Sequence, residues 1–337
     1  MTRAQSPLAD ATWIASFADA FGHRPTIHTL FEGERTVAAL PMVRAGGVLS
    51  RAWVSLDNEH HPYWPIPGTL TTKSAERLLS RLLDTADYVF LRRLPMHDAN
   101  WTALLEAACC LRAPVVGHQS DAGDARIALE GTWAELRDRL PKNFQRDLPR
   151  KQRQLEKLGR LELTEIRAPG AELDYALAAC FDLETLGWKG SDGSPIVRDP
   201  RTLRFYGRIA RNLAATGRFA LYTLSLGDKI IAFEYCLRGG GHLEMLKLSF
   251  DPVYEKYSPG QVLRMMLLER ELGRGDLRYY HLGRPSPWKM RWASEVAPLC
   301  TLRIYAGTPR AHAAYLLGPV VRTWIKASPI VRRLRRR

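Results

Sequence analysis

Cysteine is scarce in this chain, and its placement argues against a disulfide or metal scaffold. Five cysteines occur in 337 residues, an odd number that does not suit a disulfide framework. Their spacings match no zinc-binding pattern. We therefore expect free thiols and a reducing compartment, the cytoplasm. The five residues are Cys109, Cys110, Cys180, Cys236 and Cys300.

Long hydrophobic runs are lacking too. The sequence contains no uncharged apolar stretch of ~20 residues, the length a helix needs to cross a bilayer. The N-terminal residues, MTRAQSPLADATW, contain no apolar core of a signal peptide. No phosphate-binding P-loop, catalytic triad, metal-ligand cluster or redox-cofactor motif is evident. The sequence therefore predicts no spanning helix, no secretion, no metal and no permanently bound cofactor.

Positive charge, in contrast, is abundant and concentrated. The formal net charge is +14. Residues 142–160 contain seven basic and two acidic side chains, and residues 322–337 contain seven basic and no acidic ones. The first segment is predicted to be a long helix. Either its charged face is simply solvated, with Leu155 and Leu158 packed inward, or it binds an anionic partner such as CoA phosphates, an acidic glycan, lipid headgroups or tRNA.

The last segment, residues 311–337, mixes apolar residues with arginines and is interrupted by Pro319 and Pro329. Two interpretations stay open for it. One is a disordered soluble tail, and the other is a basic amphipathic segment that lies on an anionic membrane surface. The second would hold a cytoplasmic protein peripherally at the inner face of the membrane.

The most informative stretch begins with an antiparallel hairpin. Residues 229–237 and 242–250 are rich in β-branched and aromatic side chains and flank a glycine-rich turn. Ser258, Pro259 and Gln261 then have the pattern of a helix start, in which serine caps, proline occupies the first turn and glutamine completes a capping box. A glycine-containing helix start after a strand can present backbone N–H groups to a phosphate.

The order of these features carries a family resemblance. Residues 257–260, the helix and strand that follow, and the pair Trp288-Lys289 resemble the acyl-CoA-binding core of the GNAT acyltransferase superfamily. The closer similarity is to the cellulose-biosynthesis (CelD-like) acetyltransferases, which are related to Fem-type aminoacyltransferases. Residues 183–193 and the basic run at 140–159 are similar to that branch as well. The likeness covers roughly the last two thirds of the chain well and the first third loosely.

The resemblance implies an α/β (α+β) fold with two GNAT-like halves, each a mixed, mostly antiparallel sheet flanked by helices. A polar, glycine-bearing segment at 119–124 marks the predicted boundary. We therefore expect a degenerate GNAT-like domain over 1–124, a catalytic GNAT domain over 125–310 and the basic tail over 311–337. A hairpin pattern near the start of each half suits such a duplication.

The resemblance also implies where the acyl donor binds. In the superfamily the pantetheine inserts between two splayed strands, here expected at 242–250 and 277–282, and the pyrophosphate rests on the next helix start. The co-substrate is then an acyl-CoA, with acetyl-CoA expected. The usual loop has two or more glycines and this chain has one there, so an aminoacyl-tRNA donor stays open. The expected donor-binding residues are Tyr257, Ser258, Pro259, Gly260 and Gln261.

Three residues are candidates to move the proton or stabilise the charge of the transfer. Glu234 is a carboxylate on an otherwise apolar strand face, and His281 ends a strand and titrates near neutral pH. Lys289 follows Trp288 in the best-preserved feature of the resemblance. For Glu234 a structural ion pair with Lys247 is the alternative.

That ion pair depends on strand register. If the hairpin pairs Leu237 with His242, then Lys247 lies diagonally from Glu234 on the same face. The sequence leaves the role of the carboxylate open between a base and a structural partner.

The acceptor side is predicted from the resemblance alone. It implies a pocket lined by Glu184, Trp188, Lys189 and Trp288, whereas packing and solvation are the alternative explanation for the first two. The polar and aromatic loop at 58–64 is either substrate-facing or structural.

We therefore expect an acyltransferase that moves an acyl group, expected to be acetyl, from acyl-CoA to an amine or hydroxyl of a glycan, lipid or small molecule. The alternatives are a Fem-type aminoacyl-tRNA-dependent transferase acting on a cell-wall precursor, a membrane-docked N-acyltransferase of a lipid amine, and a non-catalytic glycan- or membrane-binding accessory protein.

Overall fold

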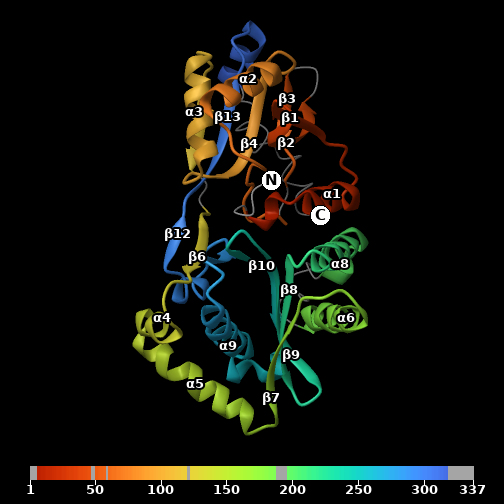
Figure 1. Cartoon of the computed structure of the whole chain (residues 1–337), viewed down its shortest axis with the longest axis vertical. Coiled ribbons are helices and arrows are strands. Elements are labelled where there is room, and N and C mark those ends of the chain that lie inside the picture. The colour runs from red at the N-terminus through yellow and green to blue at the C-terminus, as the bar shows by residue number, and fades with distance from the viewer. Residues whose placement is uncertain (1–5, 47–49, 58–59, 120–121, 187–195, 318–337) are drawn as a thin grey trace, which may run out of the picture.

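The chain forms two lobes, each built on one β-sheet (Figure 1). The computed structural model describes residues 6–46, 50–57, 60–119, 122–186 and 196–317. Both sheets are mixed and mostly antiparallel and carry helices on their faces, as the sequence predicts.

The first lobe contains a six-stranded sheet in the order β1-β2-β3-β4-β13-β5. Only β3 and β4 pair in parallel among its described strands, and helix α2 connects them. Helices α2 (Thr72–Leu83) and α3 (Ala99–Cys110) bury their apolar side chains in this lobe's core. The strands are β1 Thr26–Glu32, β2 Arg35–Gly46, β3 Arg51–Ser55, β4 Tyr88–Pro95, β5 Val115–Gln119 and β13 Leu299–Tyr305.

The second lobe contains a seven-stranded sheet in the order β12-β6-β11-β10-β9-β8-β7. Its described strands also include a single parallel pair, β10 with β11, and helix α9 connects the two. A three-strand meander, β8-β9-β10, precedes that connection, as β1-β2-β3 precedes α2 in the first lobe. The strands are β6 Asp124–Ala128, β7 Leu161–Ile166, β8 Phe219–Leu226, β9 Lys229–Gly239, β10 His242–Phe250, β11 Tyr279–Gly283 and β12 Glu295–Ala297.

Helices cover both faces of the second sheet (Figure 1). Helices α6 and α8 lie on one face and contribute to one core, while α9, α4 and α5 lie on the other and build a second core. Alternate residues of β9 divide between the two, since Tyr235 belongs to the first core and Cys236 to the second. The helices are α4 Trp133–Arg139, α5 Lys142–Glu156, α6 Ala171–Leu186, α8 Pro200–Ala214 and α9 Pro259–Arg274.

The basic helix α5 packs through a narrow apolar edge. Phe144, Leu148 and Leu155 are buried, and the basic side chains lie on the remaining surface. Leu158 is 50% exposed, so its predicted inward packing is wrong. The helix ends at Glu156, which places Leu158 in the turn that follows.

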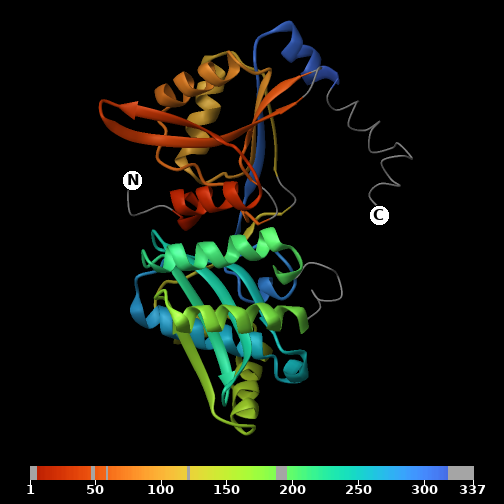
Figure 2. The same cartoon turned by 90° about the vertical axis from the view of Figure 1, so that its right-hand side faces the viewer.

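The two lobes are joined through helix α1 (Ala11–Ala20), which lies against α8 between them (Figure 2). Trp13 and Phe17 of α1 are fully buried in the core that α6 and α8 share. The indole N–H of Trp13 donates to His61 Nε2 at 2.6 Å. Contacts far apart in sequence therefore fix the loop that follows residue 59 against the second lobe.

The sheets do not follow the predicted boundary at residue 310. Strand β13 returns to the first sheet and lies between β4 and β5, although the prediction assigned it to the catalytic domain. Residues 309–317 are helical, and residues 318–337, most of the predicted basic tail, lie outside the described part of the chain. None of the helices described combines the length and apolar character that a bilayer crossing requires.

Candidate active site

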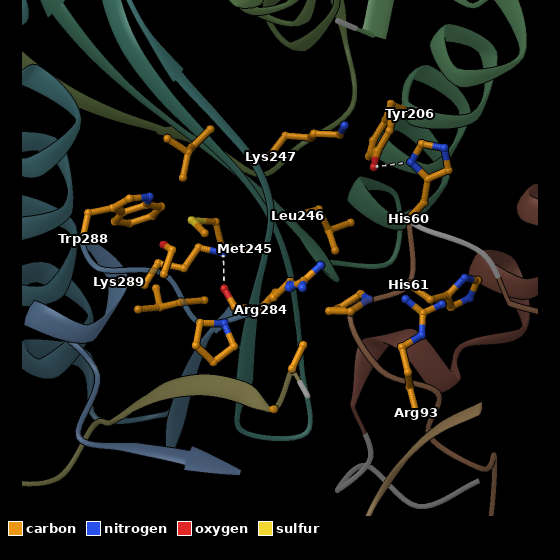
Figure 3. A pocket seen from close by; sticks show the side chains of 18 residues that line it. His60, His61, Arg93, Tyr206, Met245, Leu246, Lys247, Arg284, Trp288 and Lys289 are labelled. Carbon is orange, nitrogen blue, oxygen red and sulfur yellow. Dashed lines mark hydrogen bonds between the residues drawn. The ribbon is translucent and has the colours of Figure 1, made fainter. Parts of the chain in front are cut away.

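A cavity of about 880 Å³ opens where β10 and β11 separate (Figure 3). These strands pair at only three positions, the last being Glu244 opposite His281. Beyond it the strands part, and residues 245–248 and 282–289 line the opening. Residues 60–62 of the first lobe close its far side. The cavity thus runs from the splayed strands to the junction of the lobes.

A β-bulge lies at the edge of this opening. The register of β10 against β9 shifts between Met245 and Lys247, so Leu246 has no cross-strand partner. In a bulge the extra residue is left out of the ladder, and Leu246 lines the cavity. Its backbone N–H is therefore a candidate donor to an oxygen atom held between the strands.

The described wall of the cavity carries cations and no carboxylate. Arg93, Lys247, Arg284 and Lys289 all line it. The pKa of His60 is lowered to about 4, chiefly by burial and further by Lys247, so its imidazole is neutral at pH 7. Such a wall attracts ligands that carry negative charge.

A second neutral imidazole presents a hydrogen-bond donor. His61 accepts the Trp13 indole N–H at Nε2, and its pKa is lowered to about 3, first by burial and then by Arg93. A neutral imidazole that accepts at Nε2 carries its proton at Nδ1. That Nδ1 is buried without a hydrogen-bond partner, and His61 lines the cavity. Only the polar and aromatic character of the loop at 58–64 pointed to a hydrogen-bond donor here.

The pair Trp288-Lys289 lies on the opposite side of β10 from His60 (Figure 3). Lys289 donates from Nζ to the backbone oxygen of Arg284 at 3.0 Å, and Lys289 and Trp288 both line the cavity. The guanidinium of Arg264 lies over the Trp288 ring at 4.7 Å. Arg264, which the sequence analysis missed, comes from α9 and is 1% exposed.

Glu234 is buried behind that arginine and does not line the cavity. Its carboxylate forms an ion pair with Arg264 and accepts a hydrogen bond from the Tyr280 hydroxyl. Burial raises its pKa to about 7, although Arg264 and, more weakly, Lys289 act to lower it. The structural partner of Glu234 is therefore Arg264 of helix α9 and not the predicted Lys247 of β10.

The predicted pairing of Glu234 with Lys247 is wrong. The hairpin pairs Gly239 with His242, rather than Leu237 with His242. The bulge then turns Lys247 to the other face of the sheet, where its ammonium lies 5.0 Å from the centre of the Tyr206 ring. A one-residue irregularity reverses the face of every later side chain.

His281 lies on the face of the sheet that Glu234 does not occupy. It is 3% exposed, with Nδ1 2.5 Å from Asp124 Oδ2 and Nε2 2.8 Å from His242 Nδ1. It lines a second cavity, of about 380 Å³, rather than the one at the splayed strands. The structure thus brings Lys289 to the larger cavity and leaves Glu234 and His281 outside its lining.

The predicted donor-binding turn begins α9, but not through a capping box. Ser258 adopts a left-handed conformation with φ +53° and makes no side-chain cap. Gln261 accepts the Trp292 indole N–H at 2.6 Å instead. The amides of Ser258 and Gln261 donate to the Glu255 and Ser258 carbonyls. Pro259 has no N–H, so the amide of Gly260 is the one in this described turn that has no such acceptor.

The rest of that turn is packed. Pro259 is buried, and Tyr257 lies partly buried against the core beneath α9. None of the residues at 257–261 lines the larger cavity. They lie at the start of α9, on the face of the sheet that α9 covers.

Of the three predicted acceptor-pocket residues that precede α8, one is buried in the core and two lie outside the described residues. Glu184 is fully buried and accepts the Ile196 backbone N–H at 2.8 Å. It fixes the start of the next described segment and lines none of the large cavities. Trp188 and Lys189 lie outside the described residues.

Part of the second lobe matches a known protein family. Residues 142–290, from α5 to just beyond Lys289, match the family model described as "Acetyltransferase (GNAT) domain". No curated protein matches the sequence significantly.

Solved structures are similar over nearly the whole chain. A crystal structure of FemX has a TM-score of 0.60 at 9% identity and covers 88% of this chain and 92% of its own. The structure of L-PGS from Bacillus licheniformis has a TM-score of 0.52 at 10% identity and covers 93% of this chain and 96% of its own. The C-terminal domain of a putative lysylphosphatidylglycerol synthetase from Agrobacterium fabrum has 0.53 at 12%, covering 91% and 96%. At these identities the similarity concerns the two-lobed fold.

Proposed function

We propose that this chain, whose residues 142–290 match the model of a GNAT acetyltransferase domain, transfers an acyl group from acyl-CoA to an acceptor in the cavity between its lobes. The observation that carries the proposal is the separation of β10 from β11 after three paired positions, with Lys289 at the opening. A narrow gap between two strands suits the extended pantetheine arm of a thioester donor.

The proposed donor site continues to the start of α9. The Gly260 amide and the positive end of the helix dipole would hold a phosphate. Basic helix α5 packs beside this turn, and Lys151 donates to the Lys256 backbone oxygen there. The excess positive charge of α5 then serves the CoA phosphates, one of the partners that the sequence allows.

The proposed reaction is direct. The acceptor nitrogen or oxygen forms a bond to the thioester carbonyl carbon, an oxyanion develops, and the C–S bond then breaks to release CoA thiolate. The Leu246 amide and the Lys289 ammonium would stabilise the oxyanion or the thiolate. The proton lost by the acceptor passes to a base, and His60, a neutral imidazole at the cavity wall, is the candidate that the geometry favours.

The acceptor is proposed to be an amine or hydroxyl on an anionic molecule. The four cations of the cavity wall and the absence of a described carboxylate there support an acceptor with a phosphate or carboxylate group. A glycan, a lipid and a small molecule remain the classes, with the CelD-like branch as the narrower assignment. Docking of the 311–337 segment on an anionic membrane, in a cytoplasmic protein, would present lipid acceptors.

An aminoacyl-tRNA donor is the second candidate, because a solved structure similar in fold is that of FemX. In that case the cationic cavity and α5 would contact the tRNA end, and binding would weaken steeply with salt. A non-catalytic glycan- or membrane-binding role is the remaining alternative.

Calorimetric titration with CoA, acetyl-CoA and a long-chain acyl-CoA tests the proposal. We expect saturable binding that Gly260→Leu abolishes. Gly273→Leu, in the same helix with no neighbour within 4 Å of the added Cβ, is the matched control and should bind normally. A preference for acyl length would separate acetyl from lipid acylation.

Failure to bind CoA or either of the two thioesters would reject the acyl-CoA assignment. Salt-sensitive binding of aminoacyl-tRNA would then support the aminoacyl-tRNA-dependent transferase. If the protein does not bind aminoacyl-tRNA either, the non-catalytic role is favoured.

A further inference from the structure

The smaller cavity, between the lobes, carries a group of donor atoms that the proposed transfer does not use. His242 and Glu244 are two residues apart on β10, so both side chains point to the same face. His281 lies directly opposite Glu244 in the parallel pairing of β10 with β11. The strand register therefore brings two imidazoles and one carboxylate together, with His242 and His281 on the cavity wall.

The ligand atoms of these three residues are close enough for one ion. All lie within 4.8 Å of one another, with His242 Nδ1 2.8 Å from His281 Nε2 and the latter 3.8 Å from Glu244 Oε1. Tetrahedral ligands at zinc distances are about 3.4 Å apart. An ion that replaced the proton between the imidazoles would need them to move apart by roughly half an ångström.

Asp124 orients the histidine toward that position. Its Oδ2 lies 2.5 Å from His281 Nδ1, and because an ionised carboxylate only accepts, Nδ1 carries the hydrogen and Nε2 faces the other two groups. A carboxylate behind a ligating histidine is the usual support of a metal site. The other oxygen of Asp124, Oδ1, is buried without a hydrogen-bond partner, in a residue that is 2% exposed and lines the same cavity.

The charges also suit a cation. Glu244 and Asp124 are both almost fully buried, and a buried carboxylate is costly unless it is paired. Glu244 accepts hydrogen bonds from the Tyr63 hydroxyl and, at 3.1 Å, from Ser6 Oγ. The guanidinium of Arg126, at the same cavity, forms an ion pair with Glu295 instead.

We propose that His242, Glu244 and His281 bind one divalent transition-metal ion of the zinc class, with Asp124 supporting His281 and a coordination position open to the cavity between the lobes. Two histidines and a carboxylate suit zinc, and also cobalt or nickel. Because the Tyr63 hydroxyl ties Glu244 to the first lobe, the ion would also stiffen the contact between lobes. His281 would then be a metal ligand and not a proton acceptor.

The test is a titration of the chelator-treated full-length protein with Zn²⁺ by calorimetry and with Co²⁺ by visible absorption. We expect one ion per chain and a Co²⁺ spectrum of low coordination number. His242→Ala and Glu244→Gln should each weaken binding by more than about 10-fold, and Asp124→Asn by about 10- to 100-fold. His97→Ala, which removes another histidine of the same cavity, is the matched control and should bind like the wild type.

Binding should also tighten as pH rises, because an imidazole must lose its proton to ligate. Absence of saturable binding to the wild type, or unchanged affinity in His242→Ala, would overturn the proposal. Circular dichroism checks the fold of each variant, and if one is unfolded the wild-type Co²⁺ spectrum decides alone. Metal binding is measured without any thioester, so its outcome is independent of the proposed transfer.

Discussion

The buried pair of Arg264 and Glu234 supports the tryptophan at the cavity entrance. Both side chains are 1% exposed, and the Tyr280 hydroxyl also donates a hydrogen bond to the carboxylate. The Arg264 guanidinium also lies over the Trp288 ring, with its Cζ 4.7 Å from the ring centre. Removal of the arginine therefore affects both the stability of the second lobe and the position of Trp288.

Arg264→Ala should lower the free energy of unfolding by about 3–5 kcal/mol, the usual cost of leaving one partner of a buried ion pair uncompensated. The double variant Arg264→Met with Glu234→Leu should recover much of that loss, because apolar side chains of similar volume often replace a buried pair at little cost. Arg150→Ala is the control, since its ion pair with Asp147 is exposed on both sides and should contribute less than about 1 kcal/mol.

Urea unfolding, followed by circular dichroism, measures these differences at constant m-value. A loss below about 1 kcal/mol in Arg264→Ala would refute the reasoning, because the carboxylate would then tolerate burial without its partner. A double variant as costly as the sum of the two single variants would refute it as well, since the coupling between contacting charges would be absent.

Three further predictions concern the site and the first lobe. Lys289→Ala should reduce kcat by about 10²- to 10³-fold and leave the urea midpoint of unfolding unchanged. Lys256→Ala is the control and should keep full activity. Equal activity of the two variants would show that Lys289 does not belong to the site. Burial raises the pKa of Glu234 from 4.5 to about 7, so its contribution to stability is present below pH 4.5 and is lost as pH rises to 7. The stability of the wild type relative to Glu234→Gln should fall across that window by on the order of 3 kcal/mol, and a flat difference from pH 4.5 to 7 contradicts the assignment. Gly68→Ala should lower the free energy of unfolding by about 1–3 kcal/mol or more. Gly68 has φ +99°, and an added Cβ would lie 2.0 Å from the Val37 backbone oxygen. Gly22→Ala is the control: Gly22 also has a positive φ but lies in open space, so this change should cost less in the same urea assay.

Local patterns predicted much of the fold. The hairpin at β1–β2 forms with Gly33 at φ +60° in its turn, and a capping box of Thr132 with Glu135 begins α4. The helix predicted after Ser258 begins at Pro259. These features depend on residues close in sequence, so composition and spacing are enough to indicate them.

The failures come from register and from packing between distant segments. Glu234 lies on the face that alternation predicts, but its partner Arg264 comes from a helix, and no spacing rule links the two. The bulge at Leu246 moves Lys247 to the other face. The side chain of Gln261, which was expected to close a capping box, instead accepts a hydrogen bond from the Trp292 indole N–H.

By itself, then, the sequence determined the kinds of element. Its family resemblance predicted the mixed character of both sheets and proposed Trp288-Lys289 as a candidate pair. The tertiary structure alone decided which side chains share a cavity. His60 and His61 reach the larger cavity because α1 fixes their loop against the second lobe. His242, Glu244 and His281 meet because β10 and β11 pair in parallel at that position. Contacts across so many residues depend on the register of strands and the docking of lobes, which are set by the whole fold and leave no local pattern in the chain.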